Sequence, residues 1–201
     1  MLEDSRMPKR TYQYAKTVDA GRVEQCWTKD LNYRYYLTIP FSDRPSGKEL
    51  LILMMNPSYT DATKCDRTVR TIQEAVYNSP GLTDIAVVTI LNLYAYRHRD
   101  SAQLSELLAS EDHELAIGPE NDRWIAAIAE RAAMVVFAWG KPSRLKGVAR
   151  ERYAQRISEV TTLIGKRLDE VLCADKSQGY PLHGLRWPWR GVRLVPYRDV
   201  Q

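Results

Sequence analysis

The sequence predicts a single α/β domain of three layers, in which helices cover both faces of a central, mostly parallel β-sheet. The chain has 201 residues, of which 44% are hydrophobic and 27% charged, a composition typical of one globular domain. Short, wholly apolar runs bounded by turn residues indicate strands buried on both faces, as parallel strands are. Segments of helical periodicity separate these runs, and this alternation favours right-handed crossovers onto a parallel sheet.

The first part of the chain carries weaker signals. Residues 1–30 show no clean period, so we expect an N-terminal extension with weak local structure, followed by the domain at 31–201. Segment 33–39 is rich in aromatic and β-branched residues and ends at Pro40, which favours an edge strand. The polar stretch 42–48 predicts a turn.

Helices and buried strands then alternate to the C-terminal third. Apolar residues recur at helical spacing in several segments; Pro80-Gly81 ends the first helix, and Gly165 caps the last. Helices are expected between 66 and 79, near 103–109, from 118–122 to about 133, and around 153–164. Buried strands are expected at 50–55, 85–91 and 134–139, and a fourth strand is expected at 168–173.

Composition also excludes several classes of protein. No apolar run approaches the 18 or more residues of a membrane span, and residues 1–5 show no signal-peptide core, so we expect a cytoplasmic protein with no membrane partner. Cys26, Cys65 and Cys173 lie far apart, which argues against disulfides, a zinc knuckle or an iron–sulfur cluster. The run 111–114 has metal-ligand residue types but predicts a solvated turn. We therefore expect no metal and no cofactor.

Charge is unevenly distributed along the chain. The net charge is only +4, yet segment 101–130 holds seven acidic residues against one arginine, and 141–198 holds thirteen basic residues against five acidic ones. The basic segment is either a phosphate-binding face or a set of ordinary solvated helix surfaces.

Candidate site residues follow the predicted strands, where ligands bind in parallel sheets. The loop that starts at Asn56 is dense in polar side chains but has no glycine-rich phosphate cradle; it forms either a turn with Asp66 as helix N-cap or a site. The loop after the second strand starts at Asn92 and interleaves tyrosines with cations, a pattern typical of base reading and stacking. His183 lies in a late loop between proline and glycine, where a neutral imidazole can donate to a developing anion.

The order of these motifs resembles a bacterial and phage family known as domain of unknown function 1643. The resemblance covers roughly 33–185 and rests on ordered segments: 53–58 with Asp61, Asp66 and Arg70, then 91–95, 117–122, 138–140 and 179–183. Relatives usually carry proline after the late histidine. Gly184 stands there in this chain, so we expect a looser loop.

The same series is similar, more remotely, to the uracil-DNA glycosylase superfamily, which implies a uracil-DNA-glycosylase-like fold. The resemblance implies that Asn56 occupies the water-activating position, Tyr59 walls the base pocket, Asn92 reads the base edge and His183 stabilises the leaving base. Trp139-Gly140 matches a structural strand end. Two departures are clear: Asn56 is no anionic base, and the iron–sulfur cysteines of some branches are missing.

The expected function is that of a DNA glycosylase that hydrolyses the N-glycosidic bond of a damaged or modified base flipped out of single- or double-stranded DNA. Such catalysis needs a positioned water, a donor to the base and an extruded nucleotide, but no metal. Asp61 or Asp66 would assist the water that Asn56 orients. The expected DNA contacts are Arg97, Arg99, Arg186 and Arg190 for phosphates, and Trp187 or Trp189 for stacking.

Two other functions remain open at this point. The missing carboxylate at position 56 favours a noncatalytic nucleic-acid or nucleotide-binding module, and the modest net charge favours an enzyme that acts on free nucleosides or nucleotides. The glycosylase hypothesis makes a geometric prediction. Asn56, Asn92, Trp139 and His183 should lie on one side of the sheet, with the two asparagines and the histidine lining one pocket.

Overall fold

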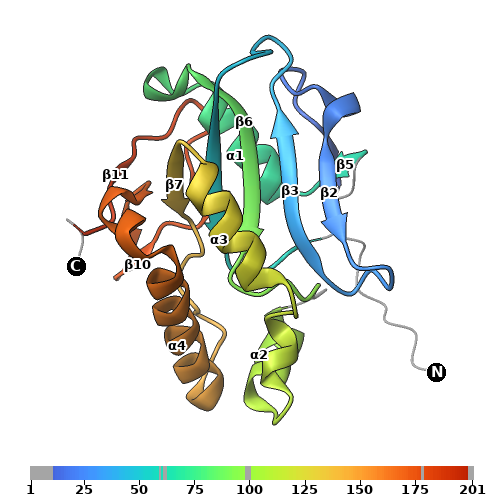
Figure 1. Cartoon of the computed structure of the whole chain (residues 1–201), viewed down its shortest axis with the longest axis vertical. Coiled ribbons are helices and arrows are strands. Elements are labelled where there is room, and N and C mark those ends of the chain that lie inside the picture. Colours follow the sequence, from blue (N-terminus) through green and yellow to red (C-terminus); the bar gives the residue numbers. More distant parts are fainter. Residues whose placement is uncertain (1–10, 59, 61–62, 98–100, 178, 199–201) are drawn as a thin grey trace.

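The structure is a computed structural model that describes residues 11–58, 60, 63–97, 101–177 and 179–198. Within these residues a seven-stranded sheet forms the centre of the molecule, in the order β11-β8-β7-β4-β6-β3-β2 (Figure 1). Its strands are β2 (Glu24–Trp27), β3 (Arg34–Pro40), β4 (Lys48–Met54), β6 (Ile85–Asn92), β7 (Met134–Phe137), β8 (Leu172–Cys173) and β11 (Val195–Pro196).

The sheet is mixed. Strand β4 runs parallel to both β6 and β7, and β7 runs parallel to β8. The outer strands β2, β3 and β11 pair antiparallel to their neighbours. The predicted, mostly parallel arrangement is thus confirmed for the central strands, whereas the outer strands are antiparallel because they are joined to the sheet without helical crossovers.

Helices cover both faces of the sheet. In Figure 1, α1 (Arg67–Tyr77) lies behind it and α3 (Asn121–Arg131) in front. Along β4 the side chains alternate between two cores: Leu50, Ile52 and Met54 pack on the α1 side, while Leu51 and Leu53 pack on the other. That second core also takes in residues of α2 (Ser101–Ala109) and α4 (Gly147–Ile164). The α/β class is therefore confirmed.

The N-terminal segment is part of the domain. The prediction of a weakly structured extension is wrong for residues 11–30, because β2 forms an edge of the sheet and β1 (Tyr12–Gln13) pairs with β5 (Lys64–Cys65). Tyr14, Ala15 and Val18 are buried in the α1-side core. Strand β3 is accordingly an inner strand and not the predicted edge, because β2 covers its outer side.

Several other elements are shorter than expected. The fourth predicted strand is only β8, because the 3-10 helix η4 (Gly165–Glu170) occupies its first half. Gly165 ends α4 as predicted, with a φ of 58°. The remaining short elements are η1 (Ala20–Arg22), η2 (Pro80–Leu82), η3 (His113–Ala116), η5 (Gly184–Arg186) and the paired strands β9 (Lys176–Ser177) and β10 (Tyr180–Pro181). In the described part of the chain, the helices are too short or too polar to cross a membrane.

Candidate functional site

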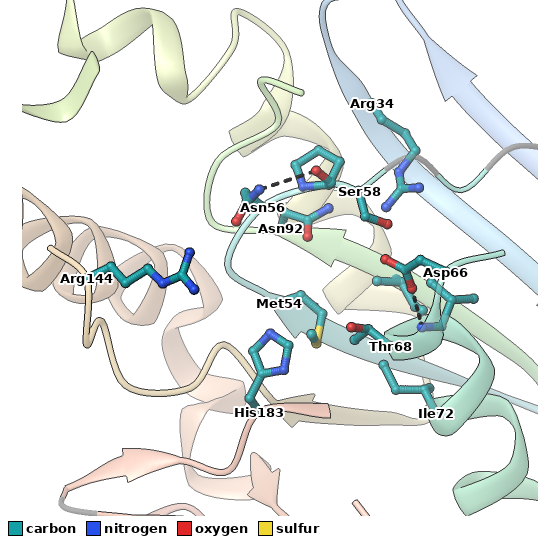
Figure 2. A pocket seen from close by; sticks show the side chains of 13 residues that line it. Arg34, Met54, Asn56, Ser58, Asp66, Thr68, Ile72, Asn92, Arg144 and His183 are labelled. Carbon is teal, nitrogen blue, oxygen red and sulfur yellow. Dashed lines mark hydrogen bonds between the residues drawn. The ribbon is translucent and has the colours of Figure 1, made fainter. Parts of the chain in front are cut away.

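A cavity of about 420 Å³ opens at the carboxyl ends of β4 and β6 (Figure 2). Asn56, Asn92 and His183 all line it, which confirms the prediction that these three residues share one pocket. The other lining residues are Arg34, Met54, Pro57, Ser58, Asp66, Thr68, Val69, Ile72, Ile90 and Arg144.

The topology of the sheet explains this position. From β4 the chain continues to α1 on one face of the sheet. From β7 it continues to α4 on the opposite face. Where neighbouring parallel strands send their connections to opposite faces, a crevice remains outside their carboxyl ends. The cavity lies beside that crevice, at the edge of the sheet where ligands bind in folds of this kind.

Asn92, the last residue of β6, is 1% exposed, and its side chain lines the cavity. Its Nδ2 has no hydrogen-bond partner among the described residues. The backbone of this loop is held by Asn121, whose Nδ2 donates to the carbonyls of Asn92 (3.0 Å) and Leu93 (3.1 Å). The backbone at Asn92 is therefore held in place, and its side-chain Nδ2 keeps a donor for a ligand.

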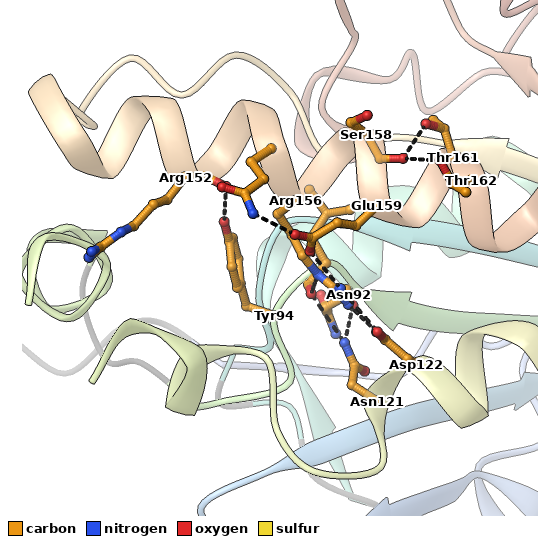
Figure 3. Close-up of polar contacts among 12 residues, drawn as sticks. Asn92, Tyr94, Asn121, Asp122, Arg152, Arg156, Ser158, Glu159, Thr161 and Thr162 are labelled. Carbon is orange, nitrogen blue, oxygen red and sulfur yellow. Dashed lines mark hydrogen bonds and ion pairs between the residues drawn. The ribbon is translucent and has the colours of Figure 1, made fainter. Parts of the chain in front are cut away.

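A buried arginine supports the same loop from α4 (Figure 3). Arg156 is 2% exposed, donates through Nε to the Leu93 carbonyl at 2.9 Å, and pairs with Asp122 and, at 3.3 Å, with Glu159. Segment 118–122, expected only as a helix start, thus also positions the loop that carries Asn92. The residue pattern did not indicate this role, because it depends on contact with α4, which follows some thirty residues later in the chain.

His183 presents a hydrogen-bond donor to the cavity. Its Nδ1 accepts the backbone N–H of Leu185 at 3.1 Å. Since Nδ1 accepts, the proton of the neutral ring is on Nε2. Burial lowers the pKa of His183, and the nearby Arg186 lowers it further, against the opposing effect of Asp66. The imidazole is therefore neutral at pH 7, as expected from the sequence.

Gly140 and Gly184 hold the histidine loop in place. A Cβ at Gly140, whose φ is +75°, would lie 2.7 Å from the Cβ of His183, so only glycine permits this approach. A Cβ at Gly184 would lie 2.7 Å from Cδ1 of Ile72 in α1. The expectation of a loose loop is wrong, because Gly184 lets the backbone pack directly on the helix. Trp139, which precedes Gly140, is fully buried and serves packing.

Two further polar residues come from the loop after β4. The carboxylate of Asp66 caps α1 by accepting the Val69 N–H at 2.7 Å, as predicted, and it also lines the cavity. Asn56 donates through Nδ2 to the Pro57 carbonyl at 3.3 Å, which leaves its Oδ1 as an acceptor. Two other candidates of this loop, Tyr59 and Asp61, lie outside the described residues.

Sequence reasoning missed two arginines of the cavity, Arg34 and Arg144. Arg34 is 2% exposed; its Nε has no hydrogen-bond partner among the described residues, and its Nη1 makes one long contact of 3.5 Å to the Thr60 carbonyl. Burial lowers the pKa of Arg34 to about 10, so it stays charged at neutral pH. A lone charge within the aromatic and β-branched run 33–39 was the signal that could have found it.

The predicted stacking residues do not gather at the cavity. Trp187 is 3% exposed, belongs to the α1-side core and donates to the Leu182 carbonyl at 3.1 Å. Trp189 is 57% exposed, and Arg190 covers its ring at 4.8 Å. However, Asn78 at the C-terminus of α1 donates to the Trp189 carbonyl, whereas the cavity lies at the N-terminus of that helix.

The predicted phosphate contacts are also spread out. Arg186 is exposed in η5. Of the predicted phosphate-binding arginines, it is the nearest in sequence to the cavity residue His183, which it follows by three residues. Arg97 lies over the ring of Trp27 at 5.1 Å, and Arg99 lies outside the described residues. As for metals, the described residues form no group of three or more histidine, cysteine or acidic side chains able to hold an ion.

Comparisons with known proteins add the family. A search of curated proteins and a search of solved structures each found no match. A family model described as a protein of unknown function, DUF1643, matches residues 34–185, which include every described residue that lines the cavity. The chain therefore belongs to the DUF1643 family.

Proposed function

We propose that this protein is a DNA glycosylase, which hydrolyses the N-glycosidic bond of a base flipped out of DNA into the cavity. One observation carries the proposal: a single cavity combines the neutral His183, the buried amide of Asn92 and the carboxylate of Asp66. These are a donor for a leaving base, a reader of a base edge and a group that accepts a proton. The resemblance of the ordered sequence motifs to the uracil-DNA glycosylase superfamily points to the same function.

The proposed reaction transfers a glycosyl group to water. The oxygen of a water molecule attacks C1′ of the sugar while the bond from C1′ to the base nitrogen breaks, and the base takes the bonding electron pair. The proton that the water loses passes to the Asp66 carboxylate and from there to the base. The products are an abasic sugar and the neutral base, so the reaction needs no redox partner.

Each residue has a distinct task in this scheme. The Nε2–H of His183 donates to the oxygen of the base, where negative charge develops in the transition state. Asn92 binds the base edge through its Nδ2, which has no hydrogen-bond partner among the described residues. The Oδ1 of Asn56 orients the water, and Asp66 supplies the carboxylate that position 56 lacks.

The DNA strand would approach from the rim of the cavity. Arg144 is exposed and lines the cavity, and Arg186 is exposed in the loop after His183; we propose both as phosphate contacts. Trp189 and Arg190 lie at the far end of α1, whose 11 residues span roughly 16 Å. They would therefore contact only DNA that extends along this helix.

The test is a screen for abasic sites in single- and double-stranded oligonucleotides that carry uracil, hypoxanthine or phage-type modified bases. With an excised base, His183→Ala should lower turnover by on the order of a hundredfold and leave DNA affinity nearly intact. His113→Ala, a histidine on the helical face away from the cavity, is the matched control and should not change turnover. Absence of abasic product from every base would refute the proposal.

Asn56→Asp provides a second test of the same scheme. A carboxylate at this position would orient the water and also stabilise the cationic sugar, so activity should survive or rise on an accepted base. If the fold is intact and neither protein releases a base, the noncatalytic binding module replaces the glycosylase.

A second candidate function is an enzyme that acts on free nucleotides. The distance of Trp189 and Arg190 from the cavity favours it, because these residues were the expected grip on a DNA strand. Binding measured at several salt concentrations separates the two. DNA contacts give a steep fall of affinity with salt, whereas a single nucleotide gives a shallow one.

A further inference from the structure

The start of α1 and the side chain of Arg34 meet at one end of the cavity (Figure 2). We propose that they form a subsite for the phosphate group of the substrate nucleotide. The identity of the ligand as a nucleotide rests on the proposed function, whereas the phosphate chemistry rests on the residues themselves. Arg34 and the backbone N–H groups at this helix end had no role in the reaction above, to which this helix end contributed only the N-cap side chain of Asp66.

The helix contributes the first half of the subsite. The first N–H groups of an α-helix have no partner within the helix, and the helix dipole places partial positive charge there. The Asp66 side chain accepts one of these groups, the N–H of Val69, while Thr68 in the first turn lines the cavity. Such helix ends bind phosphate and other oxyanions.

Arg34 contributes the second half, and its position results from an irregularity in β3. Cys26 pairs with Tyr36 but Trp27 pairs with Arg34, so Tyr35 is an extra residue in the strand. Tyr36 packs against Trp124 of α3 on the far face of the sheet. Regular alternation would send Arg34 to that far face too. The extra residue instead turns the guanidinium toward the cavity on the α1 side.

Among the described residues, the hydrogen bonding of Arg34 is incomplete. A guanidinium offers five N–H donors, and burying a cation is costly unless those donors and the charge are compensated. Nε has no partner among the described residues, and the single contact of Nη1 is long. The Nδ2 of Asn92 is also buried and lacks a partner within the described part of the chain, and Asn92 lines the same cavity. The ligand that completes this site must therefore bring several acceptors.

The charges around the cavity favour an anion. Among the described residues that line it, the charged groups are the guanidinium groups of Arg34 and Arg144 and the carboxylate of Asp66, and His183 is neutral. A phosphate supplies negative charge together with several acceptor oxygens, and the planar fork of arginine binds two of these at once. Phosphate therefore fits the subsite better than a neutral base edge does.

Calorimetric titration of the full chain with two sugars tests the subsite without reference to any base. The probes are 2-deoxyribose 5-phosphate and 2-deoxyribose, which differ only in the phosphate. We expect the phosphorylated sugar to bind at least about tenfold more tightly, since hydrogen bonds to charged groups carry this much binding energy. Equal affinity for the two sugars, or no binding of either, overturns the proposal.

Variants of Arg34 test whether this residue is responsible for the preference for the phosphorylated sugar. Arg34→Met should reduce the preference for the phosphorylated sugar by about tenfold or more, while Arg34→Lys, which keeps the charge but loses the fork, should retain part of it. Methionine fills similar space without a buried charge, so this variant should stay folded, which a thermal unfolding curve checks. Arg123→Met, an exposed arginine on α3, is the control and should bind like the unmodified protein. An unchanged preference in Arg34→Met overturns the proposal.

A third probe identifies the source of the phosphate. The methyl ester of 2-deoxyribose 5-phosphate carries the single charge of an internal DNA phosphodiester. If it binds as tightly as the monoester, the subsite takes a phosphate of a DNA strand; if only the monoester binds, the subsite takes the terminal phosphate of a free nucleotide.

Failure of the phosphate subsite is distinguishable from failure of the proposed hydrolysis. Base release with no phosphate preference removes the subsite alone, and phosphate preference without base release removes the hydrolysis alone.

Discussion

Replacing Gly140 by alanine should disable the site without altering any side chain that is proposed to contact the substrate. The backbone of Gly140 has a φ of +75°, which costs an alanine about 1–2 kcal/mol. The new Cβ would also lie 2.7 Å from the Cβ of His183, whereas carbon atoms prefer about 3.5–4.0 Å. One of the two loops must therefore move by about 1 Å, and such overpacking costs about 1–3 kcal/mol.

The expected loss of unfolding free energy is thus about 2–5 kcal/mol in total. Gly179→Ala is the matched control, because Gly179 has a φ of +81° and no atom within 4 Å of its added Cβ. The Gly179→Ala variant therefore has only the energetic cost of the positive φ, with no added steric contact. Urea unfolding of both variants isolates the contact with His183 as the difference between them.

The same pair of variants tests the role of His183. A shift of about 1 Å in a catalytic group costs on the order of a hundredfold in turnover, so Gly140→Ala should release base far more slowly than Gly179→Ala. If the two variants unfold at the same urea concentration and release base at the same rate, the close approach of the two loops has no functional meaning, and the reasoning is wrong.

Three further expectations concern the surroundings of the cavity. Asn121→Ala should cost about 1–3 kcal/mol in urea unfolding, because two carbonyls of the loop after β6 lose their donor, and it should weaken ligand binding. The pKa of His183 is lowered by burial below its ordinary 6.5, so the unfolded chain binds more protons below that pH. The protein should accordingly lose stability as pH falls below 6.5, and His183→Gln should lose less. Trp187→Ala should cost about 3–5 kcal/mol and Trp189→Ala less than about 0.5 kcal/mol, and equal thermal unfolding shifts would contradict their assigned burial.

The fold was largely predictable where periodicity is strong. The apolar runs at 50–55 and 85–91 became the parallel pair β4 and β6, and the spacing of Val69, Ile72 and Val76 gave α1. Residues 11–30 were not predictable in this way, because β2 has only four residues and is stabilised by pairing with β3, not by a pattern of its own. The same holds for β8 and β11, two residues each.

The site was predictable where chemistry follows strand ends. Asn56, Asn92 and His183 were placed together correctly, because loops after parallel strands meet at one edge of the sheet. The tryptophans were harder to place, since sequence does not show which of two rings near the C-terminus turns into the core. Arg34 could not be placed at all, because the direction of its side chain depends on the register between two strands.

The extra residue in β3 has an evolutionary consequence. Deleting the codon of Tyr35 would restore regular pairing with β2 and leave Arg34 on the cavity side, because Arg34 would then directly precede Tyr36 and alternate with it. The spacing between the arginine and Tyr36, together with the pairing register, decides whether the strand presents a cation to the cavity. Relatives with an arginine directly before the position of Tyr36 would be expected to keep this cation without the extra residue. Alignments of this family should therefore be read for gaps in β3 as carefully as for substitutions.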